Sequence, residues 1–373
     1  MQNRIIGIDM ARSLAILLVT WKHCMYCFGA TGELSGWAHY GLETLMQLAT
    51  PVFLILFGTM LELVYRPRFE RGLRRDTTQR LFKRSLQCYG YYCLAIIVFF
   101  MVLGTYSWHS LPVVFAGFIS VPNSHLLAFY AAALALSPGL IFLRVRYGLK
   151  PIIAASVLVH LCHFLINQLP EAPELFGRDY LQHMSGFLYG RGVDFIGPSL
   201  LHGMTLVCFG MLFGFGLRKS SRLGDTASFS PNVSYWIMGI TAVWIVILWD
   251  WQSPLNVLQS LADASLRIDS HPLYFAVGIF GATLMTLILI YLYDFQKMKV
   301  GRSLEVYGRR SLFAFGIGNI LTYITPASWI SLFGVWGSVL LLFSIVCALT
   351  IAYDQLDQFL QKTKPILKPE PLA

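Results

Sequence analysis

Apolar and polar residues alternate in long blocks along this chain of 373 residues. A helix of about 20 apolar residues is long enough to cross the hydrocarbon core of a bilayer. Ten segments approach or exceed that length, namely 4–28, 41–65, 86–104, 124–143, 151–169, 192–217, 233–249, 273–294, 311–327 and 331–353. The pattern therefore predicts an all-α fold, a polytopic transmembrane helix bundle of about ten spans.

The composition agrees with this pattern, because 56% of the residues are hydrophobic and only 13% are charged. Soluble domains carry roughly 25% charged residues. We expect one transmembrane domain over residues 1–361 and, from its Pro and Lys content, a short disordered cytoplasmic tail over 362–373. The first apolar segment has no small-residue cleavage site, so we interpret it as a retained span.

Lys and Arg residues are distributed very unevenly between the two sets of predicted connections. With both termini on the same side, only Arg178, Arg191 and Arg267 lie in the opposite set of connections. Residues 66–85 alone contain eight basic residues, Arg66, Arg68, Arg71, Arg74, Arg75, Arg80, Lys83 and Arg84. Positive charge marks the cytoplasmic side, so both termini are predicted there. The net charge of +9 then reflects anionic lipid headgroups as partners and not nucleic acid.

The first span carries four ionisable residues, Asp9, Arg12, Lys22 and His23. Charge in hydrocarbon is costly, so such residues usually face the bundle interior and mark function. Eleven residues at about 100° each bring His23 to within roughly 20° of Arg12, ~16 Å along the helix. Asp9 lies one turn before Arg12, where it can pair with the guanidinium. Lys22 points away and is expected to reach the membrane interface.

The predicted orientation places Asp9 and Arg12 toward the cytoplasm and His23 near the outer end of this helix. Histidine can accept and return a proton near neutral pH when a partner orients it. Glu43 lies at a similar depth in the second apolar segment and is our candidate partner. The other interpretation of Glu43 is a carboxylate solvated at the membrane edge.

Two further patterns bear on binding. Arg80, Lys83 and Arg84 share one helix face and form a compact cationic surface suited to phosphate groups, whereas the rest of the basic segment is typical of anionic lipid binding. His160 and His163 also share a face, but no carboxylate or cysteine nearby in sequence completes a metal site, and we expect none. Cys24 and Cys27 form C-x-x-C, which we interpret as buried small side chains.

Three stretches resemble a known family. Arg12 and His23 form R-x10-H within a span that opens RIIGIDMARSLAI, which resembles the functional signature of the acyltransferase-3 family of integral membrane acyltransferases. Residues 51–92 are similar to the branch that succinylates periplasmic glucans, and GRRSLFAFGIGN at 308–319 is similar to the family's G-R-x-S-L segment. Phe57 and Asn319 stand where the family often has Ser and His.

The resemblance implies that Arg12 and His23 are an essential pair, with acyl-CoA entering from the cytoplasm and a hydroxyl acceptor outside. We therefore predict an O-acyltransferase that moves an acetyl or succinyl group from acetyl-CoA or succinyl-CoA to a carbohydrate hydroxyl at the periplasmic face of a bacterial inner membrane. His23 would be the general base or a transient acyl carrier. Arg12 would hold the donor, Asp9 would fix Arg12, and Arg80, Lys83 and Arg84 would meet the nucleotide phosphates. No permanently bound cofactor is expected.

A second interpretation from another class keeps the same residues. Arg12 and His23 would then form the binding and proton-relay pair of a transporter or flippase for an anionic sugar-linked or carboxylate substrate. A non-catalytic membrane scaffold agrees with the hydrophobicity but not with the charges in the first span. Neither oligomeric state nor the glycan is predicted by the sequence.

Overall fold

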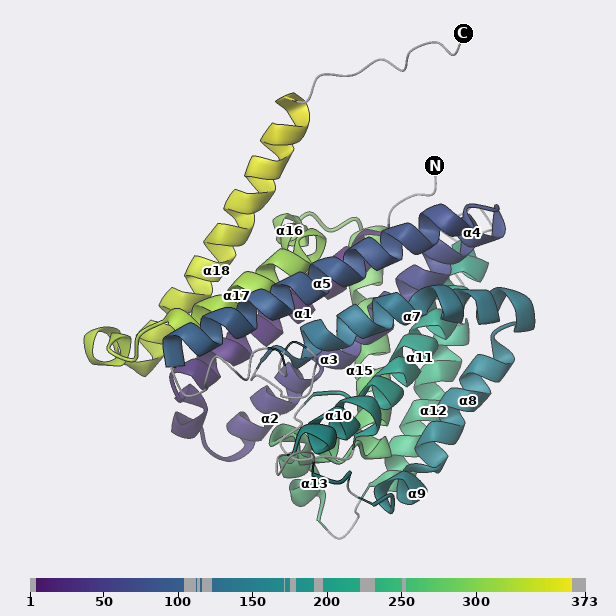
Figure 1. Cartoon of the computed structure of the whole chain (residues 1–373), viewed down its shortest axis with the longest axis horizontal. Helices are drawn as coiled ribbons and strands as arrows, with labels where there is room; N and C mark the ends of the chain where they lie inside the picture. Colours follow the sequence, from purple (N-terminus) through teal and green to yellow (C-terminus); the bar gives the residue numbers. More distant parts are fainter. Residues whose placement is uncertain are drawn as a thin grey trace.

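The chain forms a bundle of helices in a computed structural model (Figure 1). The structure describes residues 5–103, 112, 115, 123–170, 172–174, 179–190, 197–221, 232–249 and 253–363. Within these ranges every regular element is helical, which confirms the predicted all-α class. Most of the predicted tail, from residue 364 onward, lies outside the described residues.

The elements of the first half follow the predicted apolar segments. They are α1 (Ile6–Cys27), η1 (Ala30–Glu33), α2 (Gly36–Gln47), α3 (Ala49–Met60), the π-helical turn η2 (Leu61–Tyr65), α4 (Arg66–Glu70), α5 (Arg74–Leu103), α7 (His125–Tyr147), α8 (Lys150–Leu161), α9 (His163–Asn167) and α10 (Tyr180–Tyr189). Helices α2 to α4 are continuous enough to form one apolar stretch from Gly36 to Glu70.

The second half continues the same architecture. It contains α11 (Leu200–Ser221), α12 (Asn232–Leu248), α13 (Pro254–Ala262), α14 (Ser265–Ile268), α15 (Pro272–Ile290), the π-helical turn η5 (Tyr291–Phe295), η6 (Arg302–Leu304), α16 (Glu305–Arg309), α17 (Ser311–Ile324) and α18 (Trp329–Thr363). Helix α18 has a non-helical residue at Gly334, and its C-terminal part extends away from the bundle (Figure 1).

Six helical stretches are long and apolar enough to cross a membrane, among the residues described. They are Gly36–Glu70, Arg74–Val102, His125–Tyr147, Leu200–Arg218, Pro272–Phe295 and Trp329–Lys362. Helices α8, α12 and α17 are apolar but shorter. Helix α1 is in neither group, because its 22 residues include Asp9, Arg12 and Lys22. The chain is thus a multi-pass membrane protein, while ten spans and cytoplasmic termini stay predictions.

Helix α1 lies in the interior of the bundle, where it packs against α2, α3, α15, α16, α17 and α18. In Figure 1 it runs behind α5 and α17. The approach to α16 is close enough that a Cβ on Gly308 would overlap the carbonyl oxygen of Asp9. The amide of Gly308 donates to Ser13 Oγ at 2.8 Å, and Ser13 Oγ donates to the Asp9 carbonyl at 2.9 Å. Glycine at this position lets the two backbones touch, and this contact fixes the position of α1 along α16.

The basic segment 66–85 was predicted as a connection that becomes helical near Arg80, and the structure makes nearly all of it helical. Helix α4 and the start of α5 occupy it, and only residues 71–73 separate them. Its charges lie at helical spacing, since Arg66 donates to Glu70 at 2.8 Å and Arg80 donates to Asp76 at 3.1 Å, both i, i+4 pairs. Such pairs stabilise a helix surface. The high density of charge indicated a connection, but the i, i+4 ion pairs stabilise a helix there.

Candidate active site

The N-terminal end of α1 is held by an acidic side chain from the opposite half of the chain. Asp294, in the π-helical turn η5, accepts hydrogen bonds from the amides of Ile6 at 2.8 Å and Gly7 at 2.7 Å. The first amides of a helix have no partner within the helix, so a carboxylate there satisfies them and interacts favourably with the helix dipole. This contact fixes where α1 begins and therefore the depth of Asp9 and Arg12.

Asp9 and Arg12 lie together one turn later, as their spacing predicted. A carboxylate oxygen of Asp9 lies 3.6 Å from a guanidinium nitrogen of Arg12, an ion pair longer than a hydrogen bond. The Arg12 side chain retains 21% of its exposure. Because the pair is long, the guanidinium keeps N–H groups that a bound carbonyl or carboxylate can accept from.

Arg12 lines a cavity of about 340 Å³ between α1, α3, α5, α7 and α17. The wall is apolar over most of its area, with Ile16, Phe53, Phe57, Met60, Tyr65, Cys88, Leu126, Leu127, Tyr130, Leu134, Leu312 and Phe315. Its polar residues are Arg12, Arg84 and Ser311. An apolar cavity with a few convergent polar groups is the usual form of a small-molecule site. The volume and lining suit a flexible acyl chain or thioester arm that ends at a charged group.

The three predicted phosphate-binding residues divide in the structure. Arg84 lines the cavity, whereas Arg80 is paired with Asp76 and Lys83 is exposed on the same helix. All three side chains are exposed on α5, within two turns of one another. Their predicted role toward phosphate stays a prediction, with Arg84 the best placed.

His23 lies at the far end of α1 and reaches a partner on α17. Its Nδ1 lies 2.9 Å from Oδ1 of Asn319, and Nδ2 of Asn319 donates to the carbonyl oxygen of Asn123 at 2.8 Å. The imidazole also packs on Phe315, with the ring centroids 5.8 Å apart. Phe315 therefore touches the cavity on one side and His23 on the other.

Glu43 contacts the neighbours of His23 on α1. Its Oε2 lies 3.3 Å from Nζ of Lys22 and accepts a hydrogen bond from the Tyr26 hydroxyl at 3.1 Å. The predicted position of Lys22 at the interface is wrong, since Lys22 is 6% exposed. A buried ammonium needs an opposite charge, and α2 provides one, so the ion pair replaces the membrane surface as its partner. The role of Glu43 toward His23 stays a prediction, and any such role passes through Lys22 and Tyr26.

The residue that sequence reasoning did not assign is Asn319. The resemblance singled out its position as a departure, but nothing in the spacing connects it with His23, 296 residues earlier. A buried amide in the middle of a predicted span was the available signal, and Asn319 is 0% exposed. Within the described residues, no group of three or more His, Cys, Asp or Glu side chains is arranged to hold a metal ion.

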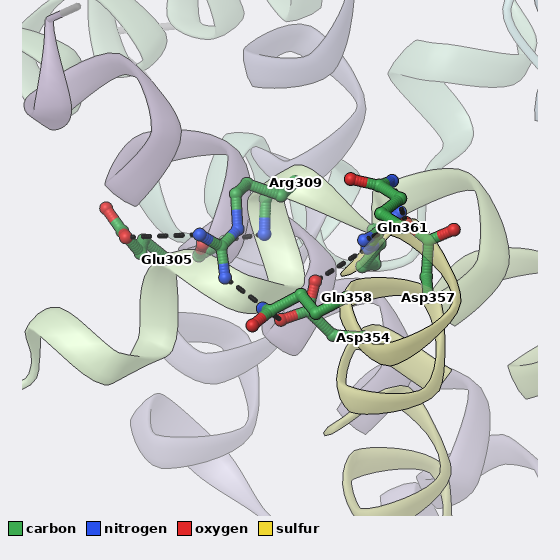
Figure 2. Close-up of polar contacts among 9 residues, drawn as sticks. Glu305, Arg309, Asp354, Asp357, Gln358 and Gln361 are labelled. Carbon is green, nitrogen blue, oxygen red and sulfur yellow. Dashed lines mark hydrogen bonds and ion pairs between the residues drawn. The ribbon is translucent and has the colours of Figure 1, made fainter. Parts of the chain in front are cut away.

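A second set of charges is fully paired and lies at the end of α18. Figure 2 shows Arg309 between Glu305 and Asp354, with the Asp354 carboxylate at 3.0 Å from Arg309 and 2.7 Å from Arg310. These contacts join α16 and the start of α17 to α18. They bind helices together and border no described cavity, so we interpret them as structural.

The comparisons with known proteins point in the same direction as the site. Residues 4–185 match the family model described as heparan-alpha-glucosaminide N-acetyltransferase, catalytic. No curated protein and no solved structure matches the chain. The matched region includes Asp9, Arg12, His23 and Arg84, whereas Asn319 lies outside it. The branch that succinylates periplasmic glucans is not distinguished by this match, which covers just under half of the chain and supports a transmembrane enzyme of the acetyltransferase type.

Proposed function

We propose that this protein is a membrane O-acyltransferase that moves an acetyl or succinyl group from acyl-CoA to a carbohydrate hydroxyl across the membrane. One observation carries the proposal: Arg12 opens into an apolar cavity whose wall, Phe315, packs directly against His23. A donor arm in the cavity would thus place its reactive end near a histidine. The family match to an acetyltransferase domain supports the reaction type.

The donor half of the proposal uses the cavity and its two arginines. The acyl-pantetheine arm of coenzyme A would lie along the apolar wall, while Arg84, with Arg80 and Lys83 nearby, would meet the nucleotide phosphates. Arg12, with its spare N–H groups, would hold the thioester carbonyl, and Asp9 would keep the guanidinium in place. Donors aimed at the carbonyl oxygen stabilise the negative charge that develops there in acyl transfer.

The acceptor half uses His23. The imidazole takes the proton of the acceptor hydroxyl, and the oxygen then attacks the thioester carbonyl. The tetrahedral intermediate collapses, the carbon–sulfur bond breaks, and the thiolate of coenzyme A receives the proton from the imidazolium. Atoms and charge balance without any further reactant. In the covalent variant, His23 itself would carry the acyl group before the hydroxyl attacks.

The test is acyl transfer by the purified full chain in lipid nanodiscs, with acetyl-CoA or succinyl-CoA and a soluble glycan. We expect free thiol to appear together with a glycan that is heavier by one acyl group in the mass spectrum. His23→Ala should lower the rate by about 10²–10⁴-fold, the usual contribution of general acid–base catalysis.

The control is His39→Ala on α2, which should leave the rate unchanged. A rate that survives His23→Ala, or movement of a glycan or carboxylate across proteoliposomes without any acyl product, would overturn the proposal. The second result would favour the transporter interpretation.

A further inference from the structure

The side-chain amide of Asn319 lies between two groups of different chemistry. One is the backbone carbonyl oxygen of Asn123, 2.8 Å from Nδ2, and the other is Nδ1 of His23, 2.9 Å from Oδ1. A carbonyl oxygen can only accept a hydrogen bond, so the amide nitrogen must face Asn123. The amide oxygen then faces His23. Its orientation follows from chemistry, although the shape of an amide alone does not reveal it.

This orientation determines which nitrogen of His23 carries the proton. An amide oxygen only accepts, so Nδ1 of His23 must donate. In a neutral imidazole one nitrogen donates and the other holds a lone pair, which leaves Nε2 unprotonated. The amide oxygen of Asn319 thus selects one of the two tautomers of the His23 imidazole.

The arrangement is rigid enough to hold the tautomer. Asn319 is 0% exposed, so water does not compete for its amide. Asn123 has a φ of 62°, a left-handed conformation that asparagine adopts more readily than most residues. That turn leads directly into α7, which begins at His125. Three segments distant in sequence therefore converge on this hydrogen-bonded chain.

We propose that Asn319 is a positioning residue that holds His23 in the Nδ1–H tautomer, so that Nε2 is the nitrogen that takes the proton or the acyl group. The proposal rests on the proposed function for the chemistry of Nε2. Because the partner is a neutral amide, the imidazolium gains less stabilisation than a carboxylate would give. His23 would therefore pass its proton on to the leaving thiolate readily.

The first measurement concerns the tautomer and needs no substrate. Protein labelled with 15N-histidine is studied in lipid by magnetic resonance, and the His23 signals are assigned by their loss in His23→Gln. We expect Nδ1 to give the shift of a protonated nitrogen and Nε2 that of an unprotonated one. The reverse assignment, or an equal mixture, would overturn the proposal.

The second measurement uses Asn319→Leu, which keeps the branching at Cγ but removes the acceptor. We expect the two tautomers to mix and kcat to fall by about tenfold or more, because a histidine in the other tautomer has no lone pair at Nε2, with the KM for acyl-CoA unchanged. Asn123→Gly is the matched control, because it keeps the backbone carbonyl and tolerates positive φ. It should retain both tautomer and rate.

The outcomes separate this inference from the proposed function. A single Nδ1–H tautomer that survives Asn319→Leu overturns the positioning role, whatever the rate does. If Asn319→Leu does not fold, the tautomer of the parent and of Asn123→Gly still decides. A protein with the expected tautomer but no acyl transfer would refute the proposed function alone.

Discussion

Two arginines inside the bundle, half-buried Arg12 on α1 and buried Arg144 on α7, show how differently this bundle uses the same side chain. Arg144 is 7% exposed and donates to both carboxylate oxygens of Glu62, at 3.0 Å each. Glu62, itself 0% exposed, also contacts Arg66. Arg12 has a single carboxylate partner within the described residues, that of Asp9 3.6 Å away, and borders a cavity of about 340 Å³. The guanidinium of Arg144 is held by two short hydrogen bonds to one buried carboxylate, whereas that of Arg12 meets its carboxylate only at a longer distance and faces a cavity.

The difference teaches how to separate structural from functional charge inside a membrane protein. Buried ions are tolerated when every charge has partners, and such a cluster holds helices together. The Glu62 cluster joins α4 and α7 to η2, the π-helical turn that carries Glu62. A charge that keeps unused hydrogen-bond donors beside an apolar cavity is instead available to a ligand. The predictions below test this distinction.

Within this comparison, the largest effect should come from Arg12→Ala. Loss of its donors should lower acyl transfer by about 10²–10³-fold, the usual cost of removing one preorganised donor at a reacting carbonyl. The unfolding temperature should barely change, because Arg12 makes one long ion pair. Arg12→Lys keeps the charge but not the planar set of N–H donors, and it should recover part of the rate. Rates and melting of the same purified samples check this, and full activity in Arg12→Ala would remove the functional side of the comparison.

Glu62→Gln should act in the opposite way. Removing one carboxylate leaves Arg144 and Arg66 without their buried counter-ion, which costs about 3–5 kcal/mol of stability. We expect a lower unfolding temperature of the purified protein, while folded molecules keep their KM for acyl-CoA. Glu70→Gln is the matched control, since Glu70 is 34% exposed and its pairs should contribute about 1 kcal/mol or less. Equal melting of the two variants would contradict a structural role for Glu62.

Arg84→Ala should have the smallest effect and concern binding alone. Arg84 borders the cavity from an exposed position on α5, so it would meet the donor before and during the reaction. One charge-assisted hydrogen bond contributes about 1.5–3 kcal/mol, which corresponds to a rise in the KM for acyl-CoA of about tenfold or more. We expect kcat to stay within about twofold, on the basis that uniform binding affects KM only.

The control for Arg84 is Arg146→Ala, an exposed arginine at the end of α7 that does not line the cavity. Its KM should equal that of the parent at every salt concentration. If both variants shift equally, surface charge in general attracts the donor, and Arg84 has no particular place in the site.

The helical fold, and α1 as the helix that carries the candidate site, could be predicted from the sequence because both are local properties. Apolar blocks near 20 residues long indicate helices whatever surrounds them, and all ten predicted segments contain helix. The spacing of Asp9 and Arg12 also predicted their proximity, since neighbours three residues apart share a helix face. The fate of Lys22 was predicted wrongly, because its partner Glu43 belongs to another helix.

By itself, then, the sequence determined that α1 carries Asp9, Arg12 and His23 through an all-helical membrane protein, since helical geometry converts spacing into direction. Only the tertiary structure decided which group each of them meets. Asn319 reaches His23 across 296 residues, and Asp294 caps α1 from 287 residues away. The cavity beside Arg12 exists only where five helices converge. Such contacts depend on how helices pack against one another, and no local pattern records that packing.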